Sequence, residues 1–167
     1  MNHLKTVRIL AIASSGGHWV QLQRMRPAWD GCDVAYVTTE EGYRDSVLRD
    51  ARDRSQPAPR FYNVLSANRW QKIRLIRQFS RIMTILLRER PDVVISTGAA
   101  PGFFALKIGK MLSARTIWVD SIAIAETFSL SGQKAKSCVD LWLTQWEHIA
   151  GSADPERGLP KFKGAVV

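Results

Sequence analysis

The stretch Ile9–Leu22, ILAIASSGGHWVQL, constrains the fold more than any other part of this sequence. It overlaps Val7–Ala13, which is apolar except for Arg8 and is typical of a strand that is buried on both faces, as in a parallel sheet. A glycine turn follows this run, and an amphipathic helix begins directly after the turn. Such a unit presents free helix amides and the positive end of the helix dipole to one place, which suits an anion, most often a diphosphate. A plain connection between two elements is the alternative, because Gly-Gly is common in loops.

Apolar strand-like segments and helix-like segments alternate along the chain. The pattern predicts strands at 7–13, 33–38, 61–65, 92–96, 115–119 and 139–143, and helices at 18–26, 40–54, 69–90, 101–112 and 129–136. This alternation predicts an α/β fold with a doubly wound, mostly parallel, Rossmann-like sheet. In the usual strand order the first and fourth strands are neighbours, and ligands bind at their carboxyl ends. The loops Ser14–His18 and Thr97–Gly102 should therefore face each other across one crevice, with Asp120 at the end of the next strand.

Length and composition indicate one globular domain. The 167 residues fall within the usual range of about 100–200 per domain, here residues 1–150, with a C-terminal tail at 151–167 whose Lys161–Val167 is a candidate for docking on a partner. No stretch has the roughly 18 consecutive apolar residues that span a bilayer. Because Met1–Lys5 does not resemble a signal peptide, we expect a cytosolic protein in which Cys32 and Cys138 are reduced core thiols.

The net charge of +9 and the pI near 10.1 favour a partner with negative charge. Nucleic acid, an anionic membrane surface and phosphorylated substrates all qualify, and charge alone does not choose among them.

Several common sites are excluded by the absence of their motifs. The loop SSGGH departs from G-x-G-x-x-G, which argues against NAD or FAD as a cofactor, and no P-loop pattern is present. The serines do not stand in the G-x-S-x-G pattern of a hydrolase. His3, His18 and His148, with the two cysteines, lack metal-ligand spacing, so we expect no metal. The basic helix carries no nucleic-acid recognition motif and would leave the glycine loops unexplained.

The segment Arg69–Arg90 is predicted to be the longest helix. About half of its circumference is apolar, wider than a surface helix needs, through Ile73, Leu75, Ile76, Phe79, Ile82, Met83, Leu86 and Leu87. The other side carries a basic stripe with two apolar residues interleaved, namely Arg74, Arg77, Arg81 and Arg88 with Trp70 and Ile85. Two interpretations stay open: a core helix with a solvated basic face, or a helix lying on an anionic membrane surface.

The expected crevice contains one histidine and one isolated carboxylate. Activation of a sugar hydroxyl needs one general base, together with helix-end amides or cations that hold phosphate. Asp120 is a candidate base, with capping of the next turn as its structural alternative. His18 is a candidate base or phosphate ligand, with packing beside Trp19 as its alternative. The residues expected to bind the acceptor and its phosphate are Ser14, Ser15, Gly16, Gly17, Thr97, Gly98, Ala99, Gly102 and Ser121.

Four motifs in order, ASSGGHWVQL, STGAAPGFFALKIGK, WVDS followed by SLSG, and LTQWEH, carry a family resemblance over about Arg8–Ala150. They resemble the PssD-type exopolysaccharide glycosyltransferase subunits. They are also similar to the acceptor-binding subunit of the eukaryotic N-acetylglucosaminyltransferase that places the second sugar on dolichol diphosphate. More distantly, the glycine loop and Asp120 resemble the N-terminal half of MurG, which has a glutamate at the strand end.

The resemblance implies one half of a split GT-B enzyme, active only with a donor-binding, PssE-like partner chain. It implies metal-independent, inverting transfer from a UDP-sugar, the co-substrate, to a polyprenyl-diphosphate-linked saccharide at the inner face of the cell membrane. Glucuronic acid is the sugar implied by PssD, while galactose and N-acetylglucosamine fit the residues equally. Membrane contact would then come from Arg69–Arg90 or from the partner. A non-catalytic membrane adaptor that recruits a catalytic transferase is the alternative function, and a nucleic-acid-binding module is a third possibility.

Overall fold

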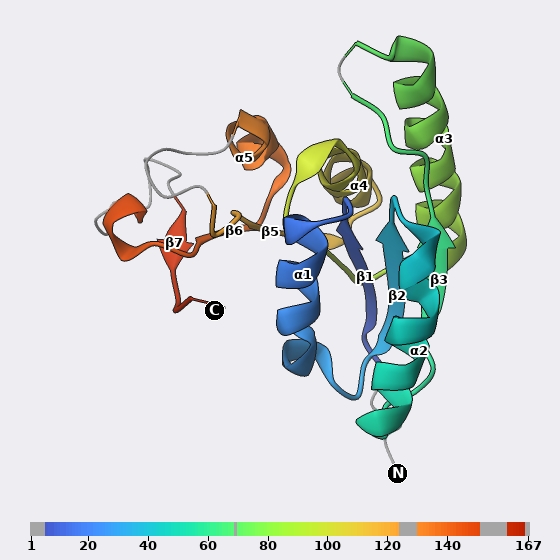
Figure 1. Ribbon diagram of the computed structural model, residues 1–167. Helices are drawn as coiled ribbons and strands as arrows, with labels where there is room; N and C mark the ends of the chain where they lie inside the picture. The colour runs from blue at the N-terminus through green and yellow to red at the C-terminus, as the bar shows by residue number, and fades with distance from the viewer. Residues whose placement is uncertain (1–5, 69, 124–129, 151–159, 166–167) are drawn as a thin grey trace.

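The protein is built on a seven-stranded, all-parallel sheet, seen in a computed structural model that describes residues 6–68, 70–123, 130–150 and 160–165 (Figure 1). The strand order is β3-β2-β1-β4-β5-β6-β7, so β1 and β4 are neighbours where the order reverses, as expected. The predicted Rossmann-like α/β fold is confirmed. The strands are β1 (Arg8–Ala13), β2 (Asp33–Thr38), β3 (Arg60–Asn63), β4 (Val93–Ser96), β5 (Arg115–Val119), β6 (Leu141–Thr144) and β7 (Lys161–Phe162).

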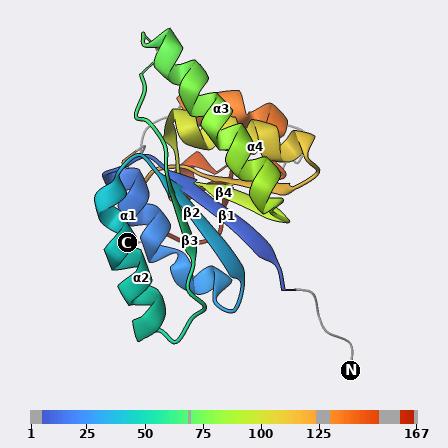
Figure 2. The same ribbon diagram turned by 90° about the vertical axis from the view of Figure 1, so that its right-hand side faces the viewer.

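Helices cover both faces of the sheet (Figures 1 and 2). One layer holds α1 (Gly17–Arg24) and α2 (Arg44–Asp53). The opposite layer holds α3 (Lys72–Glu89), α4 (Ala99–Met111) and α5 (Leu130–Ala135). Four short 3₁₀ turns lie at Arg26–Trp29, Glu41–Tyr43, Lys136–Cys138 and Glu147–Ile149.

The strand β7 was not predicted from the sequence. Its two residues pair in parallel with Leu143 and Thr144 of β6, so this part of the tail completes the sheet of its own chain. The possibility that Lys161–Val167 also docks on a partner stays a prediction, with residues 151–159 and 166–167 outside the described part of the chain.

The five apolar residues of β1 that follow Arg8 pack into two separate cores, one on each face of the sheet. Leu10 and Ile12 point toward α3, α4 and α5, whereas Ile9, Ala11 and Ala13 point toward α1 and α2. Successive side chains of a strand alternate between the two faces of the sheet. A strand that is covered on both faces therefore needs apolar residues at successive positions. All five residues are at most 8% exposed. Both cysteines are free thiols; Cys138 is buried, whereas Cys32 is half-buried rather than in the core.

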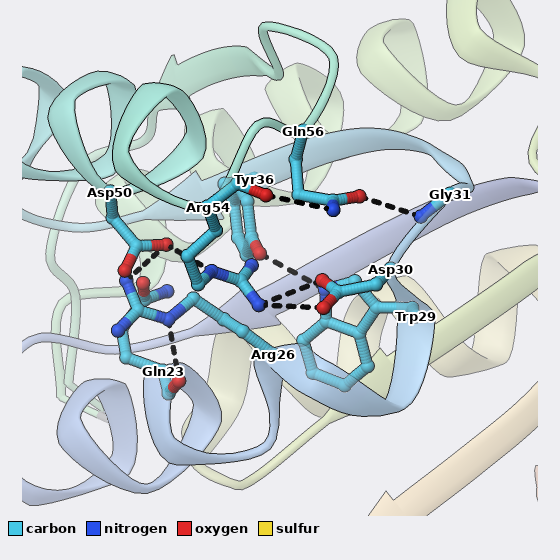
Figure 3. A network of polar contacts seen from close by, with 9 residues as sticks. All are labelled: Gln23, Arg26, Trp29, Asp30, Gly31, Tyr36, Asp50, Arg54 and Gln56. Atoms are coloured by element: carbon cyan, nitrogen blue, oxygen red, sulfur yellow. Dashed lines mark hydrogen bonds and ion pairs between the residues drawn. The ribbon is translucent and has the colours of Figure 1, made fainter.

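An ion-pair network joins the turn after α1 to the end of α2 (Figure 3). Asp50 contacts Arg26 at 2.8 Å and Arg54 at 3.0 Å, and Arg54 also contacts Asp30 at 2.7 Å. Beside them, burial raises the pKa of Tyr36, whose oxygen accepts a hydrogen bond from the Trp29 indole at 3.0 Å. Because each arginine already has a carboxylate partner, this network fastens two elements together and offers no vacant cation to an anionic ligand.

Helix α4 lies unusually close to β4 at Gly102. A Cβ atom built at Gly102 would overlap Ser96 Oγ and stand 2.9 Å from Ser96 Cβ, and Ser96 itself is fully buried. Gly102 is among the residues expected to bind the acceptor. The structure instead buries it in the helix–strand contact, and its lack of a side chain is explained by packing.

Replacing Gly102 by alanine is expected to lower the free energy of unfolding by up to about 2 kcal/mol. Alanine gains about 1 kcal/mol in helix propensity, but the overlap with buried Ser96 costs about 1–3 kcal/mol, so strain outweighs propensity. Urea unfolding of both variants would measure the difference. Gly17→Ala is the matched control, because nothing lies within 4 Å of a Cβ at Gly17. Equal stability of the two variants would contradict the packing assignment.

Candidate functional site

The β1–α1 loop ends in an uncapped helix start. Gly16 has φ 80° and ψ −141°, and within the described part of the chain no side chain caps α1. The loop is held by two residues that follow β2. The Ser15 amide donates to Thr39 Oγ1 at 2.9 Å, and the Gly16 amide donates to the Tyr43 hydroxyl at 3.3 Å. Ser15, Gly16 and Gly17 are exposed, and Ser14 is half-buried. The first-turn amides of α1 therefore form an accessible positive end, as the sequence predicted.

The two glycine loops are in direct contact through His18. Its Nδ1 lies 2.9 Å from the Thr97 carbonyl oxygen, and Thr97 Oγ1 donates to the His18 carbonyl at 2.6 Å. Gly98, with φ 145°, passes so close that a Cβ atom there would overlap the imidazole ring. The expected meeting of the loops after β1 and β4 is confirmed, because a side chain of each loop is hydrogen-bonded to a backbone carbonyl of the other.

The contact with Thr97 fixes the state of the His18 ring. A carbonyl oxygen only accepts hydrogen bonds, so Nδ1 must carry the proton. In the neutral ring, Nε2 then holds the lone pair, which is the arrangement of a histidine that takes a proton from a substrate. The side chain is half-buried at the N-terminus of α1. Its expected structural alternative, packing beside Trp19, is not the contact that orients the ring.

Helix α4 begins two residues earlier than expected. The sequence predicts the cap at Ala100, but Gly98 is the N-cap, and no side chain caps the helix within the described residues. The turn forms early because Gly98 adopts a backbone conformation that suits glycine, while its amide donates to Ser96 Oγ at 3.2 Å. Ala99 follows with φ 65° and is half-buried, whereas Thr97 is fully buried.

Asp120 lies at the end of β5 as expected, but it is only 3% exposed. Its Oδ1 accepts a hydrogen bond from the Trp118 indole at 2.8 Å, and its Oδ2 accepts one from the Trp142 indole at 2.7 Å. Through these two bonds the carboxylate holds both tryptophan side chains in place. The bonds leave little of the carboxylate for a substrate. The assignment of Asp120 as general base stays a prediction. Of the two candidates, we expect His18 rather than Asp120 to be the base. Ser121, beside it, is half-buried and accepts from the Ala123 amide at 3.3 Å.

Gln21 is a residue of this region that the sequence analysis missed. Its side-chain nitrogen donates to the Asp120 carbonyl at 2.9 Å, and its side-chain oxygen accepts from the Ile122 amide at 3.2 Å. The Trp146 indole donates to the Ile122 carbonyl at 2.9 Å. The sequence does carry one signal for Gln21: it is a polar residue that lies one helical turn after His18, on the face of α1 that packs toward the sheet. These bonds bring together the first, third and fourth motifs quoted from the sequence, and the contact between His18 and Thr97 joins the second motif to the first.

The N-terminal part of α3 extends beyond the sheet in both views (Figures 1 and 2). With no sheet beneath them, Trp70, Ile73 and Ile76 are 78%, 69% and 66% exposed. One expectation for this helix is wrong, because Ile85 is buried rather than interleaved with the arginines. Leu87, of the apolar side, is 52% exposed. The side that packs on the sheet runs instead through Gln78, Ile82, Ile85, Leu86 and Glu89.

The basic stripe expected on α3 is present. Arg74, Arg77, Arg81 and Arg88 are all exposed, and the first two flank the exposed apolar residues. Arg88 lies at the other end of the helix. Among the described residues, no helix has the length and apolar character needed to cross a membrane.

Comparisons with known proteins agree with this architecture. No protein-family model matches the chain. The chain is 26% identical over 165 residues to UDP-N-acetylglucosamine transferase subunit ALG14 of Eremothecium gossypii, covering 85% of this chain and 74% of that protein.

Solved structures with the same fold include MurG of Acinetobacter baumannii, with a TM-score of 0.68 and 11% identity over 93% of this chain and 45% of that one. UDP-N-acetylglucosamine 2-epimerase of Rickettsia bellii has a TM-score of 0.61 and 14% identity, covering 96% of this chain and 45% of that chain. The chain thus spans less than half the length of these structures. Its fold is that of one Rossmann-like half of a GT-B glycosyltransferase such as MurG, and its sequence is distantly related to a glycosyltransferase subunit.

Proposed function

We propose that this chain is the acceptor-binding subunit of a two-chain inverting glycosyltransferase. The enzyme transfers a sugar from a UDP-sugar to a polyprenyl-diphosphate-linked saccharide during assembly of an exopolysaccharide or capsule. The observation that carries the proposal is the Nδ1 contact of His18 with Thr97, which leaves Nε2 available between two uncapped helix starts. Glucuronic acid is the favoured sugar, and the name of the ALG14 relative makes N-acetylglucosamine the second candidate.

In the proposed reaction, the positive ends of α1 and α4 hold the diphosphate of the lipid-linked acceptor. His18 Nε2 takes the proton from the attacking acceptor hydroxyl. The new glycosidic bond forms between that oxygen and C1 of the donor sugar, while the bond from C1 to the diphosphate breaks and UDP leaves. The donor is held mainly by a PssE-like partner chain, since this chain has the fold of one half of the two-domain enzymes.

Reconstitution tests the proposal directly. The purified chain, a donor-binding partner and a short-chain polyprenyl-diphosphate saccharide would be combined with radiolabelled UDP-sugars, and transfer to the lipid would be measured. Transfer is expected only when both chains are present, because neither half alone forms the cleft between them. Transfer at the same rate by the partner alone would contradict a role for this chain in the reaction.

A second candidate function is a non-catalytic adaptor that holds a catalytic transferase at the membrane. The burial of Asp120 between two indoles favours this adaptor function, because Asp120 then has a structural role in the chain and not a catalytic one. The two functions differ in what His18 does, as argued in the Discussion.

The protruding end of α3 is the proposed site of contact with the inner face of the cell membrane. Exposed Trp70, Ile73 and Ile76 alternate there with Arg74 and Arg77, so apolar side chains can enter the interface while cations meet anionic headgroups. α3 begins on the side of the sheet where the strands end, which is also the side of the glycine loops. A lipid-borne acceptor would therefore meet the site at the membrane surface.

Replacing Ile73 and Ile76 by aspartate is expected to reduce flotation with vesicles containing phosphatidylglycerol by at least about tenfold, because the change removes inserted area and adds like charge to an anionic surface. Leu87→Asp on the same helix is the control, since Leu87 is exposed but lies away from the protruding end. Absence of flotation by the unaltered chain, with or without anionic lipid, would remove α3 from this role.

A further inference from the structure

The positive charge of the helices is concentrated on one face of the sheet. α1 and α2 carry four cations and three acids within their bounds. α3, α4 and α5 carry eight cations and one acid, and that acid, Glu89, is buried and paired with Arg60 at 2.6 Å. The eight cations are Lys72, Arg74, Arg77, Arg81, Arg88, Lys107, Lys110 and Lys134. An anionic partner is therefore expected on the α3–α4–α5 layer.

A groove lies within this layer, between α4 and the 3₁₀ turn Lys136–Cys138. It is a cavity of about 400 Å³, and it is lined by Phe103, Lys107, Lys110, Met111, Ser137 and Cys138. The volume is enough for part of one acyl chain and a small headgroup.

Three of the residues that line the groove, Phe103, Met111 and Cys138, form its apolar wall. Met111 is 72% exposed, and Leu112 beside it is 41% exposed, so two large apolar side chains stand open to solvent here. The Cys138 thiol donates to the Ala135 carbonyl, and burial raises the pKa of this thiol, so it stays neutral. The Phe103 ring lies 5.9 Å from that of Phe104.

One cation of the groove is available to a ligand. Lys110 is paired with Asp140, and the hydrogen bond from this lysine lowers the pKa of the aspartate. Lys107 is exposed, and it has no hydrogen-bond or ion-pair partner in the part of the chain that the structure describes. An apolar groove with one unpaired ammonium group matches a molecule with an anionic head and an apolar chain.

We infer that this groove binds one anionic phospholipid, with the headgroup phosphate at Lys107 and an acyl chain along Phe103 and Met111. The inference rests on the proposed membrane contact and extends it from the end of α3 to the whole α3–α4–α5 layer. The ring of Phe104 also contacts Phe79 of α3, with centroids 5.5 Å apart, so a row of aromatic rings connects the groove with the helix that contacts the membrane.

Native mass spectrometry of the full chain tests the inference with three probes: dioctanoyl phosphatidylglycerol, dioctanoyl phosphatidylcholine and glycerol 3-phosphate. We expect the chain to retain one phosphatidylglycerol, and Lys107→Glu to weaken that binding at least about tenfold, because it replaces an attraction to phosphate by a repulsion. Met111→Ser is expected to weaken binding of the same lipid by shortening the apolar wall. Arg52→Glu, on the exposed side of α2, makes the same change of charge on the opposite layer and should bind normally.

Equal weakening by Lys107→Glu and Arg52→Glu would overturn the inference, since binding would then follow net charge alone. Equal affinity for glycerol 3-phosphate and phosphatidylglycerol would also overturn it, because the groove would add nothing to an anion contact. These measurements need no partner chain and no sugar transfer, so their outcome is separate from that of reconstitution. In detergent with a short-chain acceptor, Lys107→Glu should transfer sugar at the unaltered rate.

Discussion

Replacing His18 by asparagine is expected to lower the turnover of the reconstituted two-chain enzyme by about 10²–10⁴-fold, the usual contribution of a general base. The asparagine side-chain amide can still donate to the Thr97 carbonyl, which His18 Nδ1 contacts at 2.9 Å. It has no group in place of Nε2, so the loop contact is kept while the proton acceptor is lost. The measurement is the steady-state rate at saturating UDP-sugar and acceptor.

Two controls separate chemistry from structure in this variant. The melting temperature and the complex with the partner are expected to stay as in the unaltered chain, because the bond between the loops is preserved. Alanine at the same position, which loses that bond as well, should be less stable than asparagine. Full turnover of the asparagine variant would exclude His18 as the base and favour the adaptor function.

Replacing Asp120 by asparagine is expected to lower the free energy of unfolding by about 2–4 kcal/mol, or roughly 5–15 °C in melting temperature. Both carboxylate oxygens accept hydrogen bonds from indole N–H groups. An amide has one acceptor oxygen, so its NH₂ group must face a second donor, and one buried indole loses its partner. Thermal and urea unfolding would measure the loss.

Asp53→Asn is the control for this variant, because Asp53 is exposed at the end of α2, where removing a negative charge should be neutral or slightly stabilising. Trp142→Phe should destabilise the chain by a similar mechanism, since it leaves Oδ2 of Asp120 without the bond at 2.7 Å. Unchanged stability of Asp120→Asn together with a loss of turnover would contradict the positioning role and restore Asp120 as the base.

The fold was predictable from the sequence because its signals are local. The buried strand β1, the glycine turn and the start of α1 are neighbours in the chain, and alternation of elements suffices for a parallel sheet. The meeting of the loops after β1 and β4 followed from strand order, which the structure confirms through the contact of His18 with Thr97.

The features that the sequence did not reveal depend on distant contacts. Asp120 is covered by Trp142, which is 22 residues away, and Gln21 reaches Ile122 across 101 residues. Helical periodicity could not show that the sheet ends before the first turns of α3, where Ile73 lies in solvent. The strand β7 has only two residues, too few to show the alternation of a strand in the sequence. It is recognised only from its pairing with β6 in the structure.

The ion pairs of Arg26 and Arg54 lie near the start of β2, whereas His18, Thr97 and Ser121 lie where their strands end. The parallel sheet therefore places these stabilising ion pairs and the residues of the candidate site at opposite ends of its strands. Substitutions of Arg26 or Arg54 should change how long the protein survives in the cell, whereas substitutions of exposed loop residues at the strand ends, such as Ser15, should change the binding of the proposed acceptor. The two properties can therefore evolve, or be engineered, with little interference between them.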